Sequence, residues 1–392
     1  MNIFHTSRMG GKMKVLIAID SFKGSLSSNE LADRIEDGIK KVYKDADIRK
    51  VPVADGGEGT IEALVDGTGG RYVEITAASP ILLPIKAKYG ILGDQKTAVI
   101  EMATASGLPL VPSDQRNPMK TTTYGTGEMI KDAITKGCRE FLVGIGGSAT
   151  NDGGIGMMKA LGVKFYDENN IELGHGGKQL SKVKKIDLSG LLPEVKECKF
   201  LIACDVDNPF YGLNGAAHVY GRQKGADDEM VLELDKGLKN FSETIKKLLN
   251  KDIADVPGAG AAGGLGGGFL AFLDGELKPG IDIVLEEVKL KEKLEGVDFV
   301  ITGEGRMDFQ SVMGKAPVGV AKLAKKYDIP VIAIAGGVAD DAGEVHNHGI
   351  DSVFSIMNYP MTLEEAMNPE RAGSLVEKNI EEIFRLIKVI NK

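Results

Sequence analysis

The chain has 392 residues, of which 43% are hydrophobic and 27% are charged, a composition typical of a soluble globular protein. Its length predicts two domains. The formal net charge of −8 disfavours a nucleic-acid partner, because such partners are usually bound through a basic face. No apolar run reaches the roughly 18 residues that a membrane-spanning helix needs, so we expect no association with a membrane.

Cysteine usage and the N-terminal residues predict where the protein works. The chain contains 3 cysteines with no CxxC pair, which is typical of a reducing compartment, and we expect a cytoplasmic location. Residues 1–12 (MNIFHTSRMGGK) lack the apolar core of a signal peptide. We expect these residues to be a disordered leader without a functional role.

The chain begins with alternating strand and helix signals. Residues 15–19 (VLIAI) form an apolar, largely β-branched run that predicts a strand buried on both faces. A helix is expected to begin near Ser27 or Ser28, where serine can cap it. A second strand is predicted to end at Val51 and Val53 and to lead through ADGGEG into another helix. This β-α-β-α order predicts a parallel, doubly wound sheet.

The C-terminal quarter repeats the same order. Strand signals at residues 299–301 and 331–334 lead into TGEGR and AGG, and a helix is predicted for about residues 317–326. A further short strand is expected near Val353, and a long final helix over about residues 370–390. Both ends of the chain therefore predict halves of one open α/β sheet.

The middle of the chain breaks this pattern. ASPILLP at residues 78–84 contains two prolines, and two strand-like runs, 85–92 and 97–102, are separated by Gly93-Asp94, which is a hairpin signal. We therefore predict an α/β protein of two domains. Residues 13–77 with 281–392 would form a discontinuous Rossmann-like domain, and residues 78–280 an inserted mixed α/β domain.

Four glycine-rich segments carry acidic or amide side chains among their glycines: VADGGEG, GIGGSATNDGG, PGAGAAGGLGGG and ITGEGRMD. Glycine lets backbone N–H groups converge on an anion such as phosphate. Carboxylates placed beside those groups would repel the anion unless a cation such as Mg²⁺ lies between them. The combination predicts metal-assisted binding of a phosphorylated ligand. The alternative is that these segments only connect strands and helices.

Most of these polar clusters follow a predicted strand, at the end where open α/β sheets bind ligands. We expect them to converge on a cleft between the two domains. Asp20, Lys23 and Ser25 bring a carboxylate, a cation and a hydroxyl into one strand-to-helix turn. A second cluster alternates acid and base after a later strand: Glu304, Arg306 and Asp308. Either cluster could instead be a solvated charged loop.

Other motifs favour or exclude particular chemistries. Asp152 follows GIGGSATN, where it could cap a helix or bind a metal. GAGAAG at residues 258–263 formally matches the dinucleotide fingerprint, but Ala-Asp-Val-Pro precedes it where a buried strand is required. Gly314-Lys315 lacks the other residues of a Walker A motif, and no protein-kinase catalytic loop occurs. A kinase of this sequence would therefore belong to neither common class.

Ten motifs, in this order, resemble those of the bacterial glycerate kinase family, the type that is neither P-loop nor ribokinase-like: DSFKGSLSS, VPVADGGEGT, GTGE, GIGGSATNDGGIGM, ACDVDNP, QKGA, PGAGAAGGLGGG, GEGRMDFQS, GKAPVGVA and HNHGID. The resemblance runs from about Met13 to the C-terminus. Two departures are small, because Arg222 stands where proline often precedes QKGA and Gly337 where serine is common. Neither position carries a residue that we need for the chemistry.

The resemblance implies phosphorylation of D-glycerate by ATP with Mg²⁺, giving 2-phosphoglycerate rather than 3-phosphoglycerate. We expect catalysis to involve Asp20, Lys23, Asp55 and Arg306, with Asp20 the first candidate for the base and Asp55 its competitor. Further candidate ligands of Mg²⁺ are Asp152, Asp205, Glu304 and Asp308. Candidate residues for binding substrate or phosphate are Ser25, Gly56, Gly57, Glu58, Gly125, Thr126, Gly127, Gly146, Gly147, Ser148, Asn151, Gly260, Gly263 and Gly264.

Two other functions remain open at this point. A kinase of the same type could act on another small hydroxy acid, and comparing kcat/KM across acids would separate the two. A non-catalytic sensor of glycerate or nucleotide would bind without turnover. The expected partners are D-glycerate and ATP, with neither nucleic acid nor membrane, and a homo-oligomer is left open.

Overall fold

The computed structural model describes residues 12–391, which form two compact units. Unit 1 contains the chain up to Asp55 together with the chain from Val284 onward, and unit 2 contains Gly56–Ile283. Apart from Lys12, the expected leader of residues 1–12 lies outside the described residues. Within the described residues, no helix is both long and apolar enough to cross a membrane.

Unit 1 contains a sheet of five parallel strands. In spatial order the strands are β13 (Ser352–Ser355), β12 (Val331–Val338), β11 (Phe299–Met307), β1 (Lys14–Ile17) and β2 (Asp47–Lys50). In chain order this is 2-1-3-4-5, one of the two common doubly wound arrangements. The fold class expected from the sequence is confirmed for this unit.

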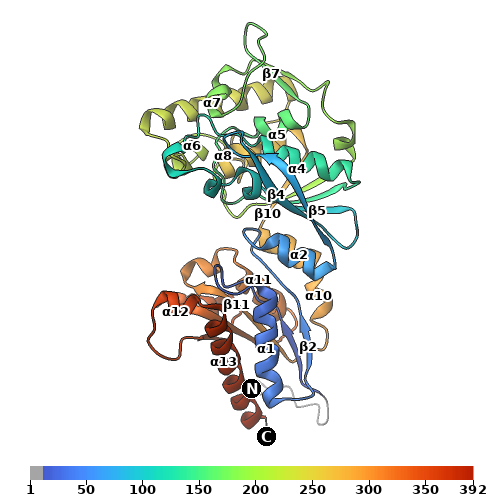
Figure 1. Cartoon of the computed structure of the whole chain (residues 1–392), viewed down its shortest axis with the longest axis vertical. Helices are drawn as coiled ribbons and strands as arrows, with labels where there is room; N and C mark the ends of the chain where they lie inside the picture. The colour runs from blue at the N-terminus through green and yellow to red at the C-terminus, as the bar shows by residue number, and fades with distance from the viewer. Residues whose placement is uncertain (1–11, 392) are drawn as a thin grey trace. The chain divides into compact units, whose positions relative to one another are not determined.

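Helices cover both faces of this sheet. α1 (Ser28–Val42) packs against α13 (Pro369–Ile390), and the two lie side by side in Figure 1. Their apolar faces meet Val15, Ile17 and Ile301 on one face of the sheet. α11 (Ala316–Lys325) contacts β11, whose alternate residues point to the opposite face. The remaining helices that lie wholly in this unit are α10 (Leu290–Lys293) and α12 (Leu363–Met367).

The start of α1 follows directly from its sequence. Ser27 caps the helix, accepting a hydrogen bond from the Glu30 N–H, while the Glu30 carboxylate accepts one from the Ser27 N–H. Leu31, Ile35 and Ile39 are fully buried, at the four-residue spacing of one helix face. The helix therefore begins where the sequence predicts. The second strand differs, because β2 ends at Lys50, before Val51 and Val53.

Unit 2 contains a mixed sheet of six strands. In spatial order they are β10 (Glu276–Lys278), β9 (Lys199–Ala203), β6 (Glu140–Gly144), β5 (Thr97–Glu101), β4 (Pro84–Ile91) and β3 (Arg71–Ala78). The first four are parallel, whereas β4 pairs antiparallel with both β5 and β3. The predicted antiparallel pairing around Gly93-Asp94 is therefore confirmed. β7 (Lys164–Tyr166) and β8 (Lys185–Asp187) form a separate two-stranded antiparallel sheet.

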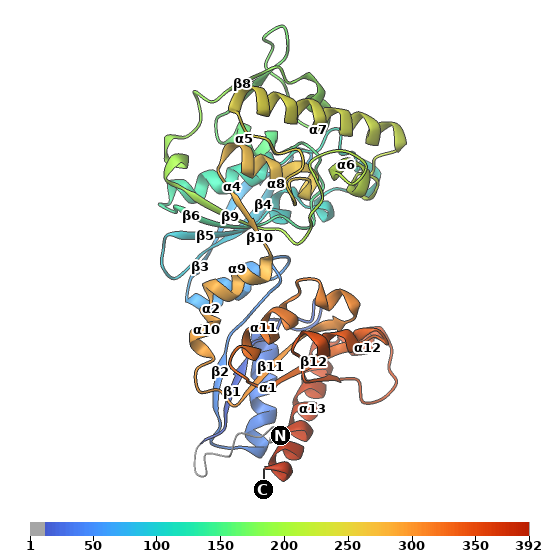
Figure 2. The same cartoon turned by 180° about the vertical axis from the view of Figure 1, so that it is seen from behind.

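Helices also lie on both faces of this second sheet, as Figure 2 shows for α2 and α4. Gly90 of β4 faces Val65 of α2, while the neighbouring Tyr89 hydroxyl donates to Asp132 of α4 on the opposite face. The helices of unit 2 are α2 (Thr60–Thr68), α3 (Ala103–Ser106), α4 (Tyr124–Thr135), α5 (Ile155–Ala160), α6 (Ala216–Tyr220), α7 (Asp228–Leu249) and α8 (Ala261–Phe272). The chain passes from unit 2 to unit 1 within α9 (Gly280–Glu287).

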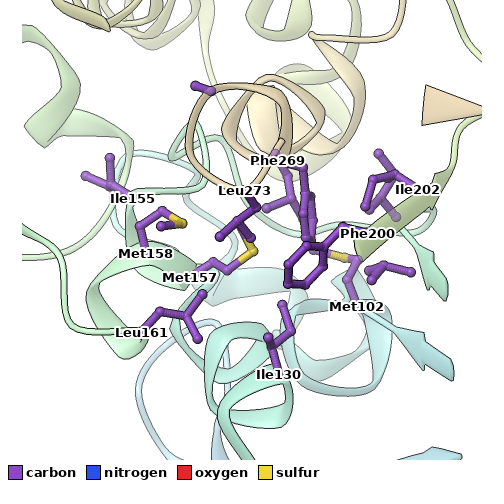
Figure 3. Close-up of a cluster of buried hydrophobic side chains, with 14 of the residues drawn as sticks. Met102, Ile130, Ile155, Met157, Met158, Leu161, Phe200, Ile202, Phe269 and Leu273 are labelled. Atoms are coloured by element: carbon purple, nitrogen blue, oxygen red, sulfur yellow. The ribbon is translucent and has the colours of Figure 1, made fainter. Parts of the chain in front are cut away.

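The core of unit 2 lies between the sheet and helices α4, α5 and α8. Figure 3 shows Ile130, Met157 and Leu273 near Phe200 and Phe269. The rings of Phe200 and Phe141 stack with centroids 4.8 Å apart. Short 3₁₀ helices complete the two units: η1 (Leu108–Leu110), η2 (Ser113–Gln115), η3 (Gly177–Lys182), η4 (Pro193–Glu197), η5 (Arg222–Lys224), η6 (Phe309–Val312) and η7 (Ala342–His348).

The boundary between the units differs from the sequence prediction. The structure divides the chain after Asp55 and after Ile283, rather than after residues 77 and 280. The reason is β3, which pairs with β4 from Arg71↔Ile91 to Ala78↔Pro84 and so belongs to the sheet of unit 2. α2 packs on the same sheet, against β4 and β5. The local pattern of residues 71–77 does not indicate this long-range pairing, so the sequence prediction left them in the Rossmann-like domain.

Candidate active site

Three neighbouring parallel strands of unit 1 place acidic residues at their carboxyl ends. Asp20 follows β1, Asp55 follows β2, and Glu304 lies in the second half of β11. From β1 the chain proceeds to β2 on one side, whereas β11, β12 and β13 progress outward on the other. Open α/β sheets bind ligands at such a reversal of strand order. We call Asp20, Asp55 and Glu304 the acidic cluster.

Two lysines contact the acidic cluster. Lys23 Nζ lies 3.5 Å from Asp55 Oδ2, and Lys315 Nζ lies 3.9 Å both from Asp55 Oδ2 and from Glu304 Oε2. The lysine side chains are 45% and 36% exposed, so both ammonium groups can also reach a ligand from solvent. Lys23 was expected from the sequence, whereas Lys315 was not. Its position directly before a helix, shortly after GEGRMD, is the signal that could have identified it.

Asp20 is the most deeply buried carboxyl of the cluster, with 3% of its surface exposed. Burial, followed by the negative charge of Asp55, raises the pKa of Asp20 to about 7, although Lys23 acts in the opposite direction. The carboxylate accepts a hydrogen bond from the Ser21 N–H at 2.6 Å. A carboxyl with this pKa exchanges its proton near neutrality, which is the property needed in a general base.

Glu304 is held in place by neighbours on both sides. Its Oε1 accepts a hydrogen bond from the Ser311 hydroxyl at 2.5 Å. Burial raises the pKa of Glu304, while the Ser311 hydrogen bond and Lys315 favour the charged form. Glu304 therefore presents a carboxylate that is fixed but only partly neutralised.

The other predicted residues of unit 1 have mixed environments. Arg306 has a side chain that is 75% exposed, and its Nε lies 3.4 Å from Asp308 Oδ2. Asp308 also accepts a hydrogen bond from the Gln310 N–H at 2.9 Å and caps η6, which is a structural role. The Ser25 hydroxyl is buried and has no hydrogen-bond partner among the described residues. Arg306 and Ser25 therefore remain available to a ligand.

In unit 2, the loop after β6 presents unpaired backbone amides. Gly146 and Gly147 are exposed, and Gly147 has a φ of +73°. The N–H groups of Gly146, Gly147 and Ser148 donate to no acceptor within residues 12–391. A Cβ added at Gly146 would meet no atom within 4 Å. Successive N–H groups in such a turn bind anions, so we call residues 145–152 the cradle loop.

The rest of the cradle loop is firmly anchored. The Gly147 carbonyl accepts a hydrogen bond from the Leu108 N–H at 2.9 Å, and the Ala149 N–H donates to the Ser106 carbonyl at 2.9 Å. Ser148 Oγ and the Thr150 carbonyl accept hydrogen bonds from Lys224 at 2.8 and 2.7 Å. Lys224 was not among the residues predicted from the sequence.

Asp152 anchors the end of the cradle loop and the start of α5. The fully buried carboxylate accepts hydrogen bonds from the N–H groups of Thr123, Gly154 and Gly156 at 2.8, 3.1 and 3.2 Å. The hydroxyls of Thr122 and Thr123 donate to it as well. Burial raises the pKa of Asp152, and these hydrogen bonds oppose that shift. Of the two roles considered from the sequence, the geometry favours anchoring over metal binding.

Asn151 has an unusual environment next to this anchor. The residue is fully buried, yet neither its side-chain oxygen nor its side-chain nitrogen has a hydrogen-bond partner in the described part of the chain. The same holds for Thr150 Oγ1. Buried polar atoms in native proteins nearly always have a hydrogen-bond partner. The side chains of Thr150 and Asn151 are therefore suited to bind an additional polar group.

Several predicted glycines are explained by close packing instead. A Cβ at Gly125 would lie 2.0 Å from the Ala78 carbonyl oxygen, and one at Gly127 would lie 2.3 Å from that of Met157. Thr126 lies between them, fully buried, with its hydroxyl 2.8 Å from that of Ser106. These residues of α4 bring helices and strands together. Ser106 links Thr126 to the cradle loop, since the Ser106 carbonyl accepts a hydrogen bond from the Ala149 N–H.

The same reason applies to residues 258–268, which we call the packed segment. A Cβ at Gly260 would lie 2.2 Å from the Pro209 carbonyl oxygen, and one at Gly263 would lie 2.0 Å from that of Thr150. A Cβ at Gly264 would approach the Phe210 ring to 2.8 Å. These predicted phosphate-binding glycines therefore face protein atoms.

Three predicted residues precede α2: Gly56, Gly57 and Glu58. Gly56 has a φ of +89°, and a Cβ there would come within 2.6 Å of the Gly280 Cα. Asp205 Oδ1 accepts a hydrogen bond from the Gly280 N–H at 3.0 Å, so this predicted metal ligand contacts the same residue that Gly56 approaches.

Glu101 lies next to the start of α2. Its carboxylate accepts a hydrogen bond from the Ile61 N–H, and burial raises the pKa of Glu101 to about 7.

The predicted metal ligands do not form a preassembled metal site. Within residues 12–391, no group of three or more His, Cys, Asp or Glu residues is arranged to hold a metal ion. The acidic cluster nevertheless offers carboxylate oxygens, which Mg²⁺ prefers. Mg²⁺ usually binds through one or two carboxylates together with substrate phosphates and water, so the residues present fit that ion.

Comparison with known proteins identifies relatives of nearly the whole chain. Residues 15–388 match the model of the Glycerate kinase family. The chain is 52% identical over 354 residues to glycerate 2-kinase of Escherichia coli (strain K12), covering 90% of this chain and 93% of the relative. It is 51% identical over 377 residues to glycerate kinase of Bacillus subtilis (strain 168), covering 96% and 98% of the two chains.

A solved structure shares the fold. The crystal structure of a protein assigned as glycerate kinase 2 from Salmonella typhimurium LT2 superposes with a TM-score of 0.90 at 44% sequence identity. The match covers 97% of this chain and 99% of that chain.

Proposed function

The chain belongs to the glycerate kinase family, and from this premise we propose that it transfers the γ-phosphoryl group of ATP to D-glycerate. The expected product is 2-phosphoglycerate, in keeping with the relative named glycerate 2-kinase, and 3-phosphoglycerate is less favoured. The observation that carries the proposal is the acidic cluster with Lys23 and Lys315 at the carboxyl ends of three parallel strands. Phosphoryl transfer needs this combination of base and cations.

Asp20 is the proposed general base. The hydroxyl oxygen of glycerate attacks the γ-phosphorus, a new O–P bond forms, and the bond from the γ-phosphorus to the bridging oxygen of ADP breaks. The hydroxyl proton passes to Asp20, whose pKa of about 7 allows it to accept a proton near neutrality. Burial of Asp20 within the cluster also limits its access to water, at 3% exposure.

The cations are proposed to bind the negative groups of both substrates. Lys23 and Lys315 are partly exposed and already held near carboxylates, so their positions are restricted before a ligand arrives. Arg306 can form a bidentate contact with a carboxylate or phosphoryl group, which lysine cannot. We assign the glycerate carboxylate to Lys23 or Arg306, and the transferred phosphoryl group to Lys315.

Glu304 and Asp55 are the residues proposed to hold Mg²⁺, since each presents a carboxylate at the strand ends. Asp205 and Asp308 each already bond a backbone N–H, and Asp152 is fully used as an anchor. When bound, the ion would neutralise charge on the nucleotide phosphates. In unit 2, the N–H groups of the cradle loop are proposed to bind phosphate.

The experiment that tests the function is ³¹P NMR of the product formed from ATP, Mg²⁺ and D-glycerate. A phosphomonoester signal coupled to the C2 proton is expected. A signal coupled to the C3 protons would replace the proposed product, and the absence of any phosphoglycerate would refute the proposal. Higher kcat/KM for another hydroxy acid would favour the alternative substrate, and binding without turnover would favour a sensor.

Variants of unit 1 test the residue roles. Asp20→Asn removes the base, and we expect kcat to fall by roughly 10²–10⁴-fold. Lys315→Met should lower kcat by about 10²–10³-fold through loss of one transition-state contact. Lys322→Met is the matched control, because Lys322 is an exposed residue of α11, the helix that Lys315 precedes, and should leave kinetics unchanged. Near-normal turnover in either test variant would remove that residue from the mechanism.

A further inference from the structure

Lys224 is a charged residue in the interior of unit 2. It ends η5, between α6 and α7, and only 2% of its surface is exposed. Nζ donates hydrogen bonds to Ser148 Oγ at 2.8 Å and to the Thr150 carbonyl oxygen at 2.7 Å. Both acceptors belong to the cradle loop, although they lie 76 and 74 residues away in the sequence.

Burial of this ammonium group carries a cost that packing alone does not explain. Burial lowers the pKa of Lys224 to about 7, and the charge of Asp152 only partly opposes that shift. Both hydrogen-bond acceptors are neutral. An apolar side chain of similar length would avoid this cost, since buried charges are often replaceable without loss of stability. The position of the ammonium group therefore suits a role in ligand binding.

The hydrogen bonds of Lys224 set the direction of two donors. Because Ser148 Oγ accepts from Nζ, the hydroxyl proton of Ser148 is directed away from Lys224 and can be donated to a ligand. The trans peptide bond places the N–H of Asn151 opposite the Thr150 carbonyl, so Lys224 also orients that N–H. The adjacent Gly146 and Gly147 amides have no acceptor in the described chain.

We propose that Lys224 is a positioning residue, which holds Ser148 and the Thr150–Asn151 peptide so that the cradle loop binds the phosphates of ATP. This inference rests on the proposed phosphoryl transfer from ATP. Lys224 acts through the loop, by its hydrogen bonds to Ser148 Oγ and to the Thr150 carbonyl oxygen. In this proposal, the binding of glycerate does not depend on Lys224.

Lys224→Met in the full-length protein tests this role. We expect the variant to remain folded, KM for ATP and the dissociation constant of Mg-ADP to rise about tenfold, and kcat to fall about 10²-fold, as for loss of an oriented donor. KM for glycerate should change by less than about twofold. Lys239→Met is the matched control on α7, because Lys239 is exposed, and it should behave as the wild type.

The outcomes separate a positioning role from a structural one. A folded Lys224→Met with wild-type kcat and KM for ATP would overturn the proposal, as would equal changes in both KM values with a lower melting temperature. If the variant does not fold, Ser148→Ala decides the question. The proposal requires this variant to raise KM for ATP and to leave KM for glycerate unchanged. If the wild type phosphorylates no glycerate, the proposed function fails, and titration with Mg-ADP alone still tests Lys224.

Discussion

Two glycine-rich parts of unit 2 have different physical reasons for their composition. At Gly146 in the cradle loop, an added Cβ would meet no atom within 4 Å. At Gly263 in the packed segment, it would lie 2.0 Å from the Thr150 carbonyl oxygen. One glycine leaves backbone N–H groups accessible, whereas the other lets two backbones touch. Glycine content therefore indicates that another group comes close to the backbone, but it does not show whether that group belongs to a ligand or to the protein itself.

Gly263→Ala should have the largest effect on stability. The position combines a φ of +71° with a contact that no side-chain rotation can relieve, because the Cβ would meet a backbone oxygen. We expect the free energy of unfolding to fall by about 3 kcal/mol or more. Urea unfolding measures this loss. A change below about 1 kcal/mol would contradict the assignment of this glycine to packing.

Gly267→Ala should have an intermediate effect. The Cβ would lie 2.5 Å from the Phe210 ring, and overpacking costs about 1–3 kcal/mol, while alanine in a helix regains up to about 1 kcal/mol. The expected net loss is about 1–2 kcal/mol in thermal unfolding. The double variant with Phe210→Leu provides the check, since a smaller side chain should recover part of the loss. Strict additivity of the two changes would refute direct contact.

Gly146→Ala should have the smallest effect on stability, within about 0.5 kcal/mol, because the site is open. The methyl group would nevertheless stand where a phosphate approaches the amides. We therefore expect KM for ATP to rise about tenfold while the melting temperature is unchanged. Wild-type kinetics in this variant would make the cradle loop an ordinary connection and remove the contrast with the packed segment.

The sequence predicted the parts of the fold that depend on local signals. Ser27 with Glu30 specified the start of α1, and the apolar runs located β1 and β11. Because parallel strands carry their following loops to one edge, the sequence predicted that the polar clusters following the strands would converge. Within unit 1, the structure brings Asp20, Asp55 and Glu304 together. What it missed depends on distant partners. The pairing of β3 with β4 and the contact of Lys224 with Ser148 have no local signature.

The discontinuity of unit 1 has a consequence for protein synthesis. β1 and β2 emerge from the ribosome first, but the neighbour of β1 on its other side, β11, follows only after all of unit 2. Unit 2 is contiguous, and domains generally fold as units during synthesis. We therefore expect chains released at residue 283 to resist protease over unit 2 while residues 12–55 are cleaved. The first strands synthesised, β1 and β2, would be among the last to be completed into their native sheet.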